Sequence, residues 1–495
     1  MDRLNYATLK ALNYDEFMLE NAPEKVLQFG EGGFLRAFVD YFFDLSNERH
    51  GFNGKVALVQ PIAQGLTDMV NDQQGLYTLY LRGFQDGKTV NDKRVISCVS
   101  RCINPYQDYD AFLVCAGNPD LRYIVSNTTE AGIVYDPESL YDQVPPVSFP
   151  AKLTRFLHER YQHFGREKGK GFVILSCELI DDNGKELKRC VNYYIDQWQL
   201  GEDFKTWVNE ENLFCSSLVD RIVTGYPRNE AERLNAENGY LDTLIDTGEI
   251  FGAWVIEGPQ WLAEELPFVD GKLPVIVTPD HKPYKQRKVR ILNGAHTTMV
   301  LGAYLAGQDI VRNCMQDDVI KGYMNKAIYD EIIPTLDLPK EELTAFAASV
   351  EERFANPFID HQLLSIALNS VSKWKARCLP SLKEYYHRFG KVAPCLALGL
   401  ASLIAFYRGD KMENGALIGV RPAGNAYEIK DDGSVLAFFL DHKDDTPDAL
   451  CHNVLSNQSF WGEDLTRIPG LEEKVAASLC CILEKGAYCA MQQVL

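Results

Sequence analysis

Short apolar runs separated by stretches of helical character dominate the first part of the chain. Val26–Phe29, 122–126 and 171–176 are examples, and the pattern continues to about residue 280. Runs that are apolar at every position are typical of parallel strands buried on both faces. Their alternation with helices predicts an α/β fold with a doubly wound parallel sheet.

Beyond a junction at 274–283 that is punctuated by prolines, the patterns become mostly helical. The longest helical patterns cover 288–305, 343–353 and 471–485. The apolar run Val435–Leu440 follows the turn-forming segment Asp431–Ser434, which predicts one strand among these helices. A chain of 495 residues exceeds a single core. We therefore expect an α/β domain over 1–280, followed by a mainly α-helical domain over 281–495.

A glycine turn follows the first apolar run. Gly30, Gly32 and Gly33 come directly after Val26–Phe29, and a helical stretch begins at Phe34. Strand, glycine turn and helix together present backbone N–H groups to a pyrophosphate, as in Rossmann-type domains. The sixth position of the usual glycine motif is Leu35, so an ordinary strand–helix turn fits this segment about equally well.

The end of the second strand bears on the choice of cofactor. The run Lys55–Gln60 ends at Gln60 and Pro61, without an acidic residue for the ribose of NAD or an arginine for the 2′-phosphate of NADP. The lack of a basic residue favours NAD.

Lys288, Asn293 and His296 recur at offsets of five and eight residues. On an α-helix the second and third would lie about 140° and 80° from the lysine, so all three would occupy one side. A tunable amine beside an amide donor and an imidazole suits proton transfer at a hydroxyl or carbonyl carbon. Two alternatives stay open: an exposed helix without chemistry, and a lyase in which the lysine forms a Schiff base.

Five segments resemble the polyol-specific long-chain dehydrogenase/reductase family, which includes the mannitol dehydrogenases. Gly30–Ala37 is similar to the family's G-x-G-x-F-x-R-A fingerprint, and Lys288–His296 is similar to its catalytic signature. Thr129–Gly132, Ser217–Ile222 and Arg353–Ile359 resemble three further family segments. The five occur in family order and span about 330 of the 495 residues.

The resemblance implies a Rossmann-type domain followed by a helical domain, with a metal-free, NAD-dependent oxidoreductase site in the cleft between them. It implies that Lys288 exchanges the proton, that Asn293 donates a hydrogen bond to the oxyanion and that His296 fixes the substrate oxygen. Asp220 would position a substrate hydroxyl or an active-site partner, and Glu130 would support the site. The residues implied in cofactor binding are Phe29, Gly30, Gly32, Gly33, Phe34 and Arg36.

Within the family, the sequence is most similar to the members that interconvert D-tagaturonate and D-altronate. Leu179 stands where the mannitol enzymes have an asparagine, which makes Asn183 the candidate substitute. Lys373, Lys375 and Arg377 form a basic cluster that could bind the carboxylate of a sugar acid. Their alternation predicts an extended segment with all three on one side. A fructuronate/mannonate dehydrogenase or a neutral polyol dehydrogenase is the alternative within the family.

Composition excludes several other classes. The formal net charge of −19 argues against nucleic acid and acidic membrane surfaces as partners. The thirteen cysteines are scattered and odd in number, and the first residues contain no apolar signal region, so we expect reduced thiols in a cytoplasmic protein. No C-x-x-C or H-E-x-x-H pattern supplies a metal site. Val392–Tyr407 is the most apolar segment and predicts a buried helix. The sequence leaves the oligomeric state open.

Overall fold

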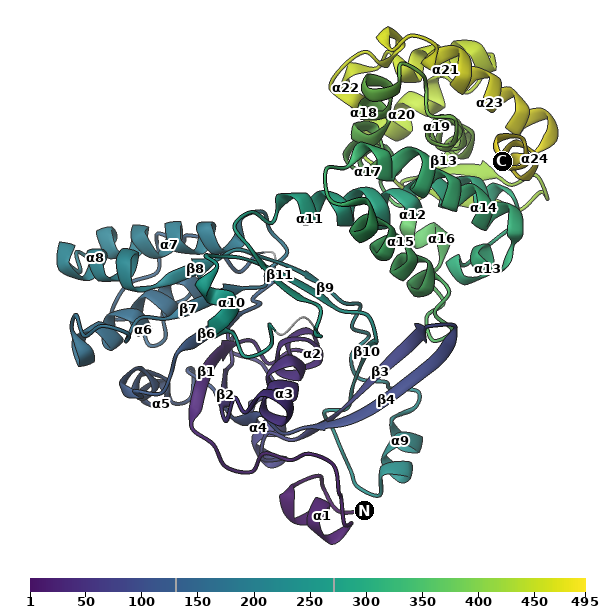
Figure 1. Cartoon of the computed structure of the whole chain (residues 1–495). Helices are drawn as coiled ribbons and strands as arrows, with labels where there is room; N and C mark the ends of the chain where they lie inside the picture. Colours follow the sequence, from purple (N-terminus) through teal and green to yellow (C-terminus); the bar gives the residue numbers. More distant parts are fainter. Residues whose placement is uncertain (130, 270–271) are drawn as a thin grey trace. The chain divides into compact units, whose positions relative to one another are not determined.

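A computed structural model describes residues 1–129, 131–269 and 272–495 (Figure 1). The chain divides into two compact units. The first unit comprises Met1–Arg82 and Val90–His281, and the second comprises Lys282–Leu495 together with the hairpin tip Gly83–Thr89. The sequence pattern gave no indication that this tip groups with the second unit.

The first unit is built on a six-stranded sheet in which every pair of neighbours is parallel. In spatial order the strands are β5 (Val99–Ile103), β2 (Lys55–Val59), β1 (Glu24–Phe29), β6 (Tyr123–Ser126), β7 (Val173–Ser176) and β8 (Leu213–Cys215). Numbered within this sheet, the order is 3-2-1-4-5-6, that of dinucleotide-binding folds. The predicted doubly wound sheet is therefore confirmed, and its order reverses between β1 and β6, where such sheets bind ligands.

Helices cover both faces of this sheet, which explains why consecutive residues of its strands, such as Val26 and Leu27, are both apolar (Figure 1). Val26 faces one core with α3 (Val39–His50), and Leu27 faces the other with α6 (Phe149–Phe164) and α7 (Asn183–Gln197). The other helices of this unit are α1 (Tyr6–Ala11), α2 (Gly33–Ala37), α4 (Thr67–Asp72), α5 (Tyr109–Val114), η1 (Cys115–Gly117), α8 (Glu202–Glu211), α9 (Ala231–Asn238) and α10 (Trp261–Glu265).

Two smaller sheets complete the first unit. One contains β12 (Val275–Thr278), β11 (Ala253–Glu257) and β9 (Ser217–Asp220), and the other contains β10 (Asp246–Glu249), β3 (Tyr77–Gln85) and β4 (Lys88–Ile96). The proline-punctuated junction therefore contains a strand, β12, because its run Val275-Ile-Val-Thr278 pairs with β11.

The second unit is mainly helical, as predicted. The pattern at 288–305 is part of a continuous helix made of α11 (Lys282–Arg287), η2 (Lys288–Asn293) and α12 (Gly294–Leu305). The patterns at 343–353 and 471–485 correspond to α15 (Lys340–Phe354) and α23 (Leu471–Lys485). The remaining helices are α13 (Val311–Gln316), α14 (Asp318–Lys326), η3 (Ala327–Ile332), η4 (Ile333–Thr335), α16 (Leu363–Ile366), α17 (Ser370–Arg377), α18 (Leu379–Phe389), α19 (Pro394–Phe406), α20 (Gly433–Asp441), α21 (Pro447–Leu455), α22 (Gln458–Trp461), η5 (Leu465–Arg467) and α24 (Ala487–Val494).

Helix α19 is the apolar segment noted in the sequence. It is buried from Cys395 to Phe406, as predicted. None of the helices in the described part of the chain combines the length and the apolar character needed to cross a membrane.

The predicted strand Val435–Leu440 is wrong, because this run lies in α20. Its buried residues are Val435, Leu436 and Phe439, a spacing that suits one face of a helix and not alternate faces of a strand. The strands of the second unit lie earlier in the chain, as β13 (Gly409–Glu413), β14 (Ala416–Val420) and β15 (Ala426–Ile429).

Candidate active site

The helix that carries Lys288, Asn293 and His296 changes its hydrogen-bond pattern at these residues. Segment η2 is π-helical, and the N–H of Gly294 bonds to the carbonyl of Val289, five residues earlier. In a π-turn, residues five apart lie one turn above each other, whereas in an α-helix they would be about 140° apart. Lys288 and Asn293, both half-buried, therefore lie on one face, closer in angle than an α-helix allows.

Gly294 lets helix α17 approach the start of α12 closely. A β-carbon at Gly294 would lie 3.5 Å from the backbone carbonyl oxygen of Arg377. The thiol of Cys378 donates a 3.7 Å hydrogen bond to the carbonyl of Gly294. The end of the basic segment thus lies beside the helix that carries the predicted catalytic residues.

The ring of His296 is packed between aromatic neighbours. It stacks on Phe354, with centroids 3.8 Å apart and planes 10° apart, and lies edge to face with His361 at 5.5 Å. Burial first, and then the charges of His361, Arg353 and Arg377, hold its pKa well below the ordinary value. A neutral imidazole has one donor and one acceptor. Its Nε2 is buried without a partner among the described residues, which a ligand oxygen would explain.

Arg377 is a half-buried cation beside this ring. Burial lowers its pKa, and its Nη1 donates a 3.3 Å hydrogen bond to the hydroxyl of Thr297. Within the described ranges, no carboxylate lies at ion-pair distance from its guanidinium. An unneutralised guanidinium in a chain of net charge −19 is suited to bind an anion.

The expectation that 373–377 is extended is wrong, because these residues form the last turns of α17. On a helix, Lys373 and Arg377 share a face, whereas Lys375 lies about 200° from Lys373. Lys373 is half-buried and donates a 2.9 Å hydrogen bond to the carbonyl of Ile366. Lys375 is exposed, and its Nζ lies 3.4 Å from where a β-carbon of Gly462 would be. The three cations therefore do not form one cluster.

The glycine turn of the first unit combines a positive φ at Gly30 with open space at Gly32. Gly30 has a φ of +128°, and a β-carbon there would lie 3.0 Å from Leu35 and 3.2 Å from the carbonyl oxygen of Asn127. Gly32 forms the N-cap of α2, and a β-carbon there would meet nothing within 4 Å. This open space above backbone N–H groups fits a pyrophosphate. Phe34 follows the turn and stacks on Phe38, with centroids 5.2 Å apart.

Arg36 is buried, and its guanidinium is bound to groups within the first unit. Its Nε donates to the carbonyl of Glu31 at 3.1 Å, its Nη1 donates to the carbonyl of Leu244 at 2.6 Å, and its Nη2 pairs with Asp246 at 3.5 Å. A β-carbon at Gly33 would lie 3.1 Å from the same Asp246 carboxylate. Arg36 therefore braces the turn through its side chain, and its contact with a cofactor stays a prediction.

The side chain of Phe29 packs in the core of the first unit. It is fully buried against Phe112 and Phe149, at centroid distances of 5.8 and 5.0 Å. Phe29 can offer a cofactor only its backbone.

Asn183 does not have the free donor that its predicted role requires. Its Nδ2 donates to the carbonyls of Glu178 at 2.9 Å and Ser217 at 3.0 Å. Its Oδ1 accepts the N–H groups of Gly184 and Ser217, both at 2.9 Å. The residue is buried at the first position of α7, so the predicted substrate contact is replaced by a role in joining β7, α7 and β9.

We expect Asn183→Ala to destabilise the fold by about 2 kcal/mol or more, because buried backbone groups lose their partners. Thermal denaturation should show a lower Tm. The KM of the variant that remains folded should match that of the unmodified protein. A raised KM at an unchanged Tm would instead support the predicted contact between Asn183 and the substrate.

Asp220 and Glu130 are the two remaining residues that were predicted to support the site. Asp220 is buried at the end of β9, opposite Ala253 in the ladder. The neighbouring Arg221 donates from Nη1 to the carbonyl of Ala37 at 2.6 Å and is structural. Glu130 lies outside the described residues.

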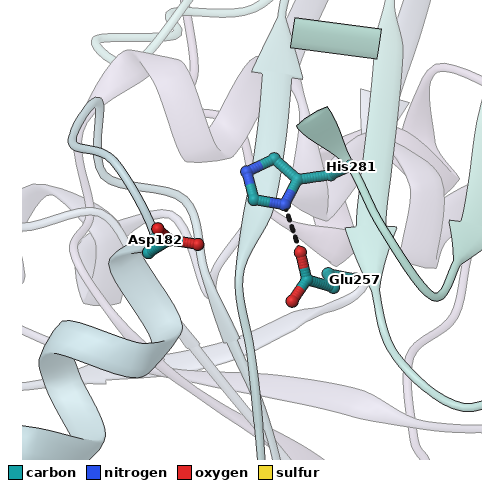
Figure 2. A group of neighbouring side chains, drawn as sticks. All are labelled: Asp182, Glu257 and His281. Carbon is teal, nitrogen blue, oxygen red and sulfur yellow. Dashed lines mark hydrogen bonds and ion pairs between the residues drawn. The ribbon is translucent and has the colours of Figure 1, made fainter. Parts of the chain in front are cut away.

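Asp182, Glu257 and His281 form the described group whose geometry would suit a metal, with ligand atoms within 4.8 Å of one another (Figure 2). His281 Nδ1 and Glu257 Oε2 share a 2.5 Å hydrogen bond. The ammonium of Lys185 pairs with Glu257 at 2.8 Å and with Asp182 at 2.9 Å. The lysine therefore stands where a metal cation would bind.

We expect that the unmodified protein does not bind Zn²⁺ at this group, and that Lys185→Met does, because removal of the ammonium leaves two carboxylates and an imidazole without their cation. Titration calorimetry with Zn²⁺ would measure this. Lys188→Met, on the same helix, is the control. Equal binding by the unmodified protein and Lys185→Met would show that the ammonium does not exclude the metal.

Sequence reasoning missed two residues beside His296. Phe354 belongs to a segment that resembles the family, but no local pattern assigns it to the imidazole. His361 is a single histidine without a spacing signal. Only the packing of α15 and the following loop against α12 brings both to His296.

Comparisons with known proteins cover almost the whole chain. Residues 24–269 match the model of the mannitol dehydrogenase Rossmann domain, and residues 280–483 match that of the mannitol dehydrogenase C-terminal domain. An altronate oxidoreductase of Klebsiella pneumoniae (strain 342) is 48% identical over 491 residues, which cover 98% of this chain and 99% of the relative. One of Shigella flexneri is 46% identical over 485 residues, which cover 97% and 98%.

Two solved structures share the fold over the full length. A D-sorbitol dehydrogenase in substrate-free form has a TM-score of 0.81 at 22% identity, with 99% of this chain and 100% of that chain covered. The Pseudomonas fluorescens mannitol 2-dehydrogenase, in a ternary complex with NAD and D-mannitol, has a TM-score of 0.65 at 21% identity, with 99% of each chain covered.

Proposed function

The chain belongs to the mannitol dehydrogenase family, and from this premise we propose that it is an NAD-dependent oxidoreductase that interconverts D-tagaturonate and D-altronate. Nearly full-length relatives at 46–48% identity that are named altronate oxidoreductases support this activity. All thirteen cysteines are free thiols, which supports a cytoplasmic location. A small sugar acid is the partner, and neither nucleic acid nor a membrane is needed.

The first unit is the proposed dinucleotide domain and the second the substrate domain. The open space above Gly32 and the brace formed by Arg36 and Asp246 support binding of the pyrophosphate at the glycine turn. Gln60 directly follows β2, with its side-chain amide bound to Thr67 and Ile62, and it offers no cation for a 2′-phosphate, which supports NAD. When bound, NAD supplies or accepts the hydride.

Lys288 is the proposed acid and base. As an ammonium it donates a proton to the ketone oxygen that becomes an alkoxide, and as an amine it accepts the proton in the reverse direction. Asn293 donates a hydrogen bond to the same oxygen. The π-turn supports this pairing because it puts the two residues one turn apart. Neutral His296 offers a donor to a neighbouring substrate hydroxyl and need not titrate. Asp220 is a proposed contact of the substrate hydroxyls in the first unit.

The observation that carries the sugar-acid assignment is the unneutralised guanidinium of Arg377 beside His296. A carboxylate at one end of the substrate would form a bidentate pair with it. A neutral polyol would leave this half-buried charge without a partner, which is costly.

Oxidation of NADH with a panel of ketones tests the proposal. We expect turnover with tagaturonate and a higher KM for fructose, with fructuronate as the isomer that tests stereochemistry. A preference for fructose over both acids would overturn the sugar-acid assignment. If no ketone supports NADH oxidation, but borohydride traps a substrate on Lys288, the chemistry is that of a Schiff base.

A further inference from the structure

His361 has a fixed position in the loop between α15 and α16. Its backbone carbonyl accepts the N–H of Val311 at 3.0 Å, and the N–H of Leu363 donates to the carbonyl of Asp309 at 2.9 Å. Arg312 holds the start of the loop through a 2.6 Å hydrogen bond to the carbonyl of Pro357. The half-buried imidazole of His361 is therefore presented by a pinned backbone.

The side chain of His361 lies at the predicted active site. Its ring is edge to face with that of His296, at 5.5 Å and 87°. His296 also stacks on Phe354, with centroids 3.8 Å apart. Since Nε2 of His296 is buried without a described partner, the two imidazoles border a place that a polar ligand would fill.

The charges recorded around the neighbouring His296 are positive. Arg353 on α15 and Arg377 on α17 both act on the neighbouring His296. The nearest acid in sequence is Asp360, which is exposed and pairs with Arg312 of α13 at 2.6 Å. Among the described residues, neither His361 nor Arg377 has a carboxylate at ion-pair distance. Burial lowers the pKa of His361, so its imidazole is neutral near pH 7 before substrate binds.

We propose that the carboxylate of the sugar acid binds between Arg377 and His361, and that His361 takes up a proton as the acid binds. The inference rests on the proposed function, and it gives His361 a share, beside Arg377, in the discrimination between sugar acids and neutral ketoses.

The direction of the pH dependence follows from linkage. A bound carboxylate favours the imidazolium, so the pKa of His361 is higher in the complex than in the free protein. Between these two values each bound acid takes up a proton, and affinity rises as pH falls, by up to about tenfold per pH unit. Below the lower value and above the higher value the affinity is constant. A neutral ketose has no such dependence.

Calorimetry with the NADH-loaded enzyme and D-altronate tests the inference, because two reduced partners cannot react. Titrations at several pH values between 6 and 8, each in two buffers of different ionisation enthalpy, measure the protons taken up. We expect uptake with the unmodified enzyme and none with His361→Gln, which should bind altronate about tenfold more weakly at the acidic end. His361→Lys keeps a permanent charge and should bind tightly at every pH without uptake.

Controls separate this role from a structural one. His387 is 84% exposed on α18, so His387→Gln should take up protons as the unmodified enzyme does. The Tm of each His361 variant reports whether it folds. Unchanged proton uptake in His361→Gln, or binding by His361→Lys that is no tighter than by His361→Gln, would overturn the inference while turnover of tagaturonate continues. Failure of the proposed function would differ, because the unmodified enzyme would then neither bind altronate nor oxidise NADH with tagaturonate.

Discussion

Replacing Lys288 with alanine should lower kcat for tagaturonate by about 10²–10⁴-fold, the usual contribution of a positioned acid or base. The physical reason is that the ketone oxygen gains a negative charge as it is reduced, and in the proposed mechanism the ammonium of Lys288 neutralises it by transferring a proton. In the proposed mechanism Asn293 donates a hydrogen bond to this oxygen, but an amide has no proton to transfer at neutral pH. Initial rates of NADH oxidation measure the loss, and titration of NADH fluorescence should show unchanged cofactor affinity.

Three further measurements distinguish a lost proton donor from a damaged helix. A small primary amine in the buffer should partly restore turnover to Lys288→Ala and leave the unmodified enzyme unaffected. Lys288→Arg keeps the charge but holds its proton too tightly, so it should stay slow. Lys383→Met, which removes an exposed lysine of α18, is the control. Normal turnover by Lys288→Ala would exclude this lysine from the chemistry.

The main sheet could be predicted because burial on both faces of a strand requires consecutive residues to be apolar. Val26 and Leu27 face opposite cores, so both must be apolar, and the run is recognisable without further context. The glycine turn was recognisable for a similar local reason, since the φ of Gly30 and the short distance to Asn127 would strain any residue with a side chain. Constraints of this kind act on neighbouring residues, so a short stretch of sequence is enough to recognise them.

The basic segment at 373–377 was misassigned because its helix depends on distant residues. The N–H groups of Ser370 and Val371, at the start of α17, donate to the hydroxyl of Tyr407 and the carboxylate of Asp431. These partners are 37 and 60 residues away in sequence. Alternating charges suit either a strand or a short helix, and only this tertiary capping decides between them.

The roles of single side chains were the least predictable. Arg36 and Asn183 both occur where the family resemblance implies a ligand contact, yet partners far along the chain, Leu244 and Ser217, satisfy their donors. The π-turn at Lys288–Asn293 could not be predicted either. A shift from four to five residues in the hydrogen-bond spacing does not require particular residue types. A motif therefore indicates which residues matter more reliably than it indicates what each contacts.

Replacing Arg377 with methionine should raise the KM for tagaturonate by about 30-fold or more, since loss of a desolvated charge pair costs about 2 kcal/mol or more. The guanidinium is half-buried and has no described carboxylate, so the substrate carboxylate is the partner that would be lost. Methionine keeps most of the apolar stem, and the packing of α17 should survive. Initial rates over a range of tagaturonate and fructose concentrations measure the effect, and the KM for fructose should change by less than about twofold.

The three cations of α17 do not all lie on one face of the helix, so their replacement should have different effects. Lys373 shares the face of Arg377, so Lys373→Met should raise the KM for tagaturonate by a smaller factor, because its ammonium is already bound to Ile366. Lys375 points away toward Gly462, so Lys375→Met should resemble Arg467→Met, which removes a guanidinium whose side chain is 80% exposed. Equal increases for tagaturonate and fructose in Arg377→Met would mean that the arginine supports the fold and does not bind the carboxylate. A large effect of Lys375→Met would mean that the carboxylate lies on the opposite face of α17.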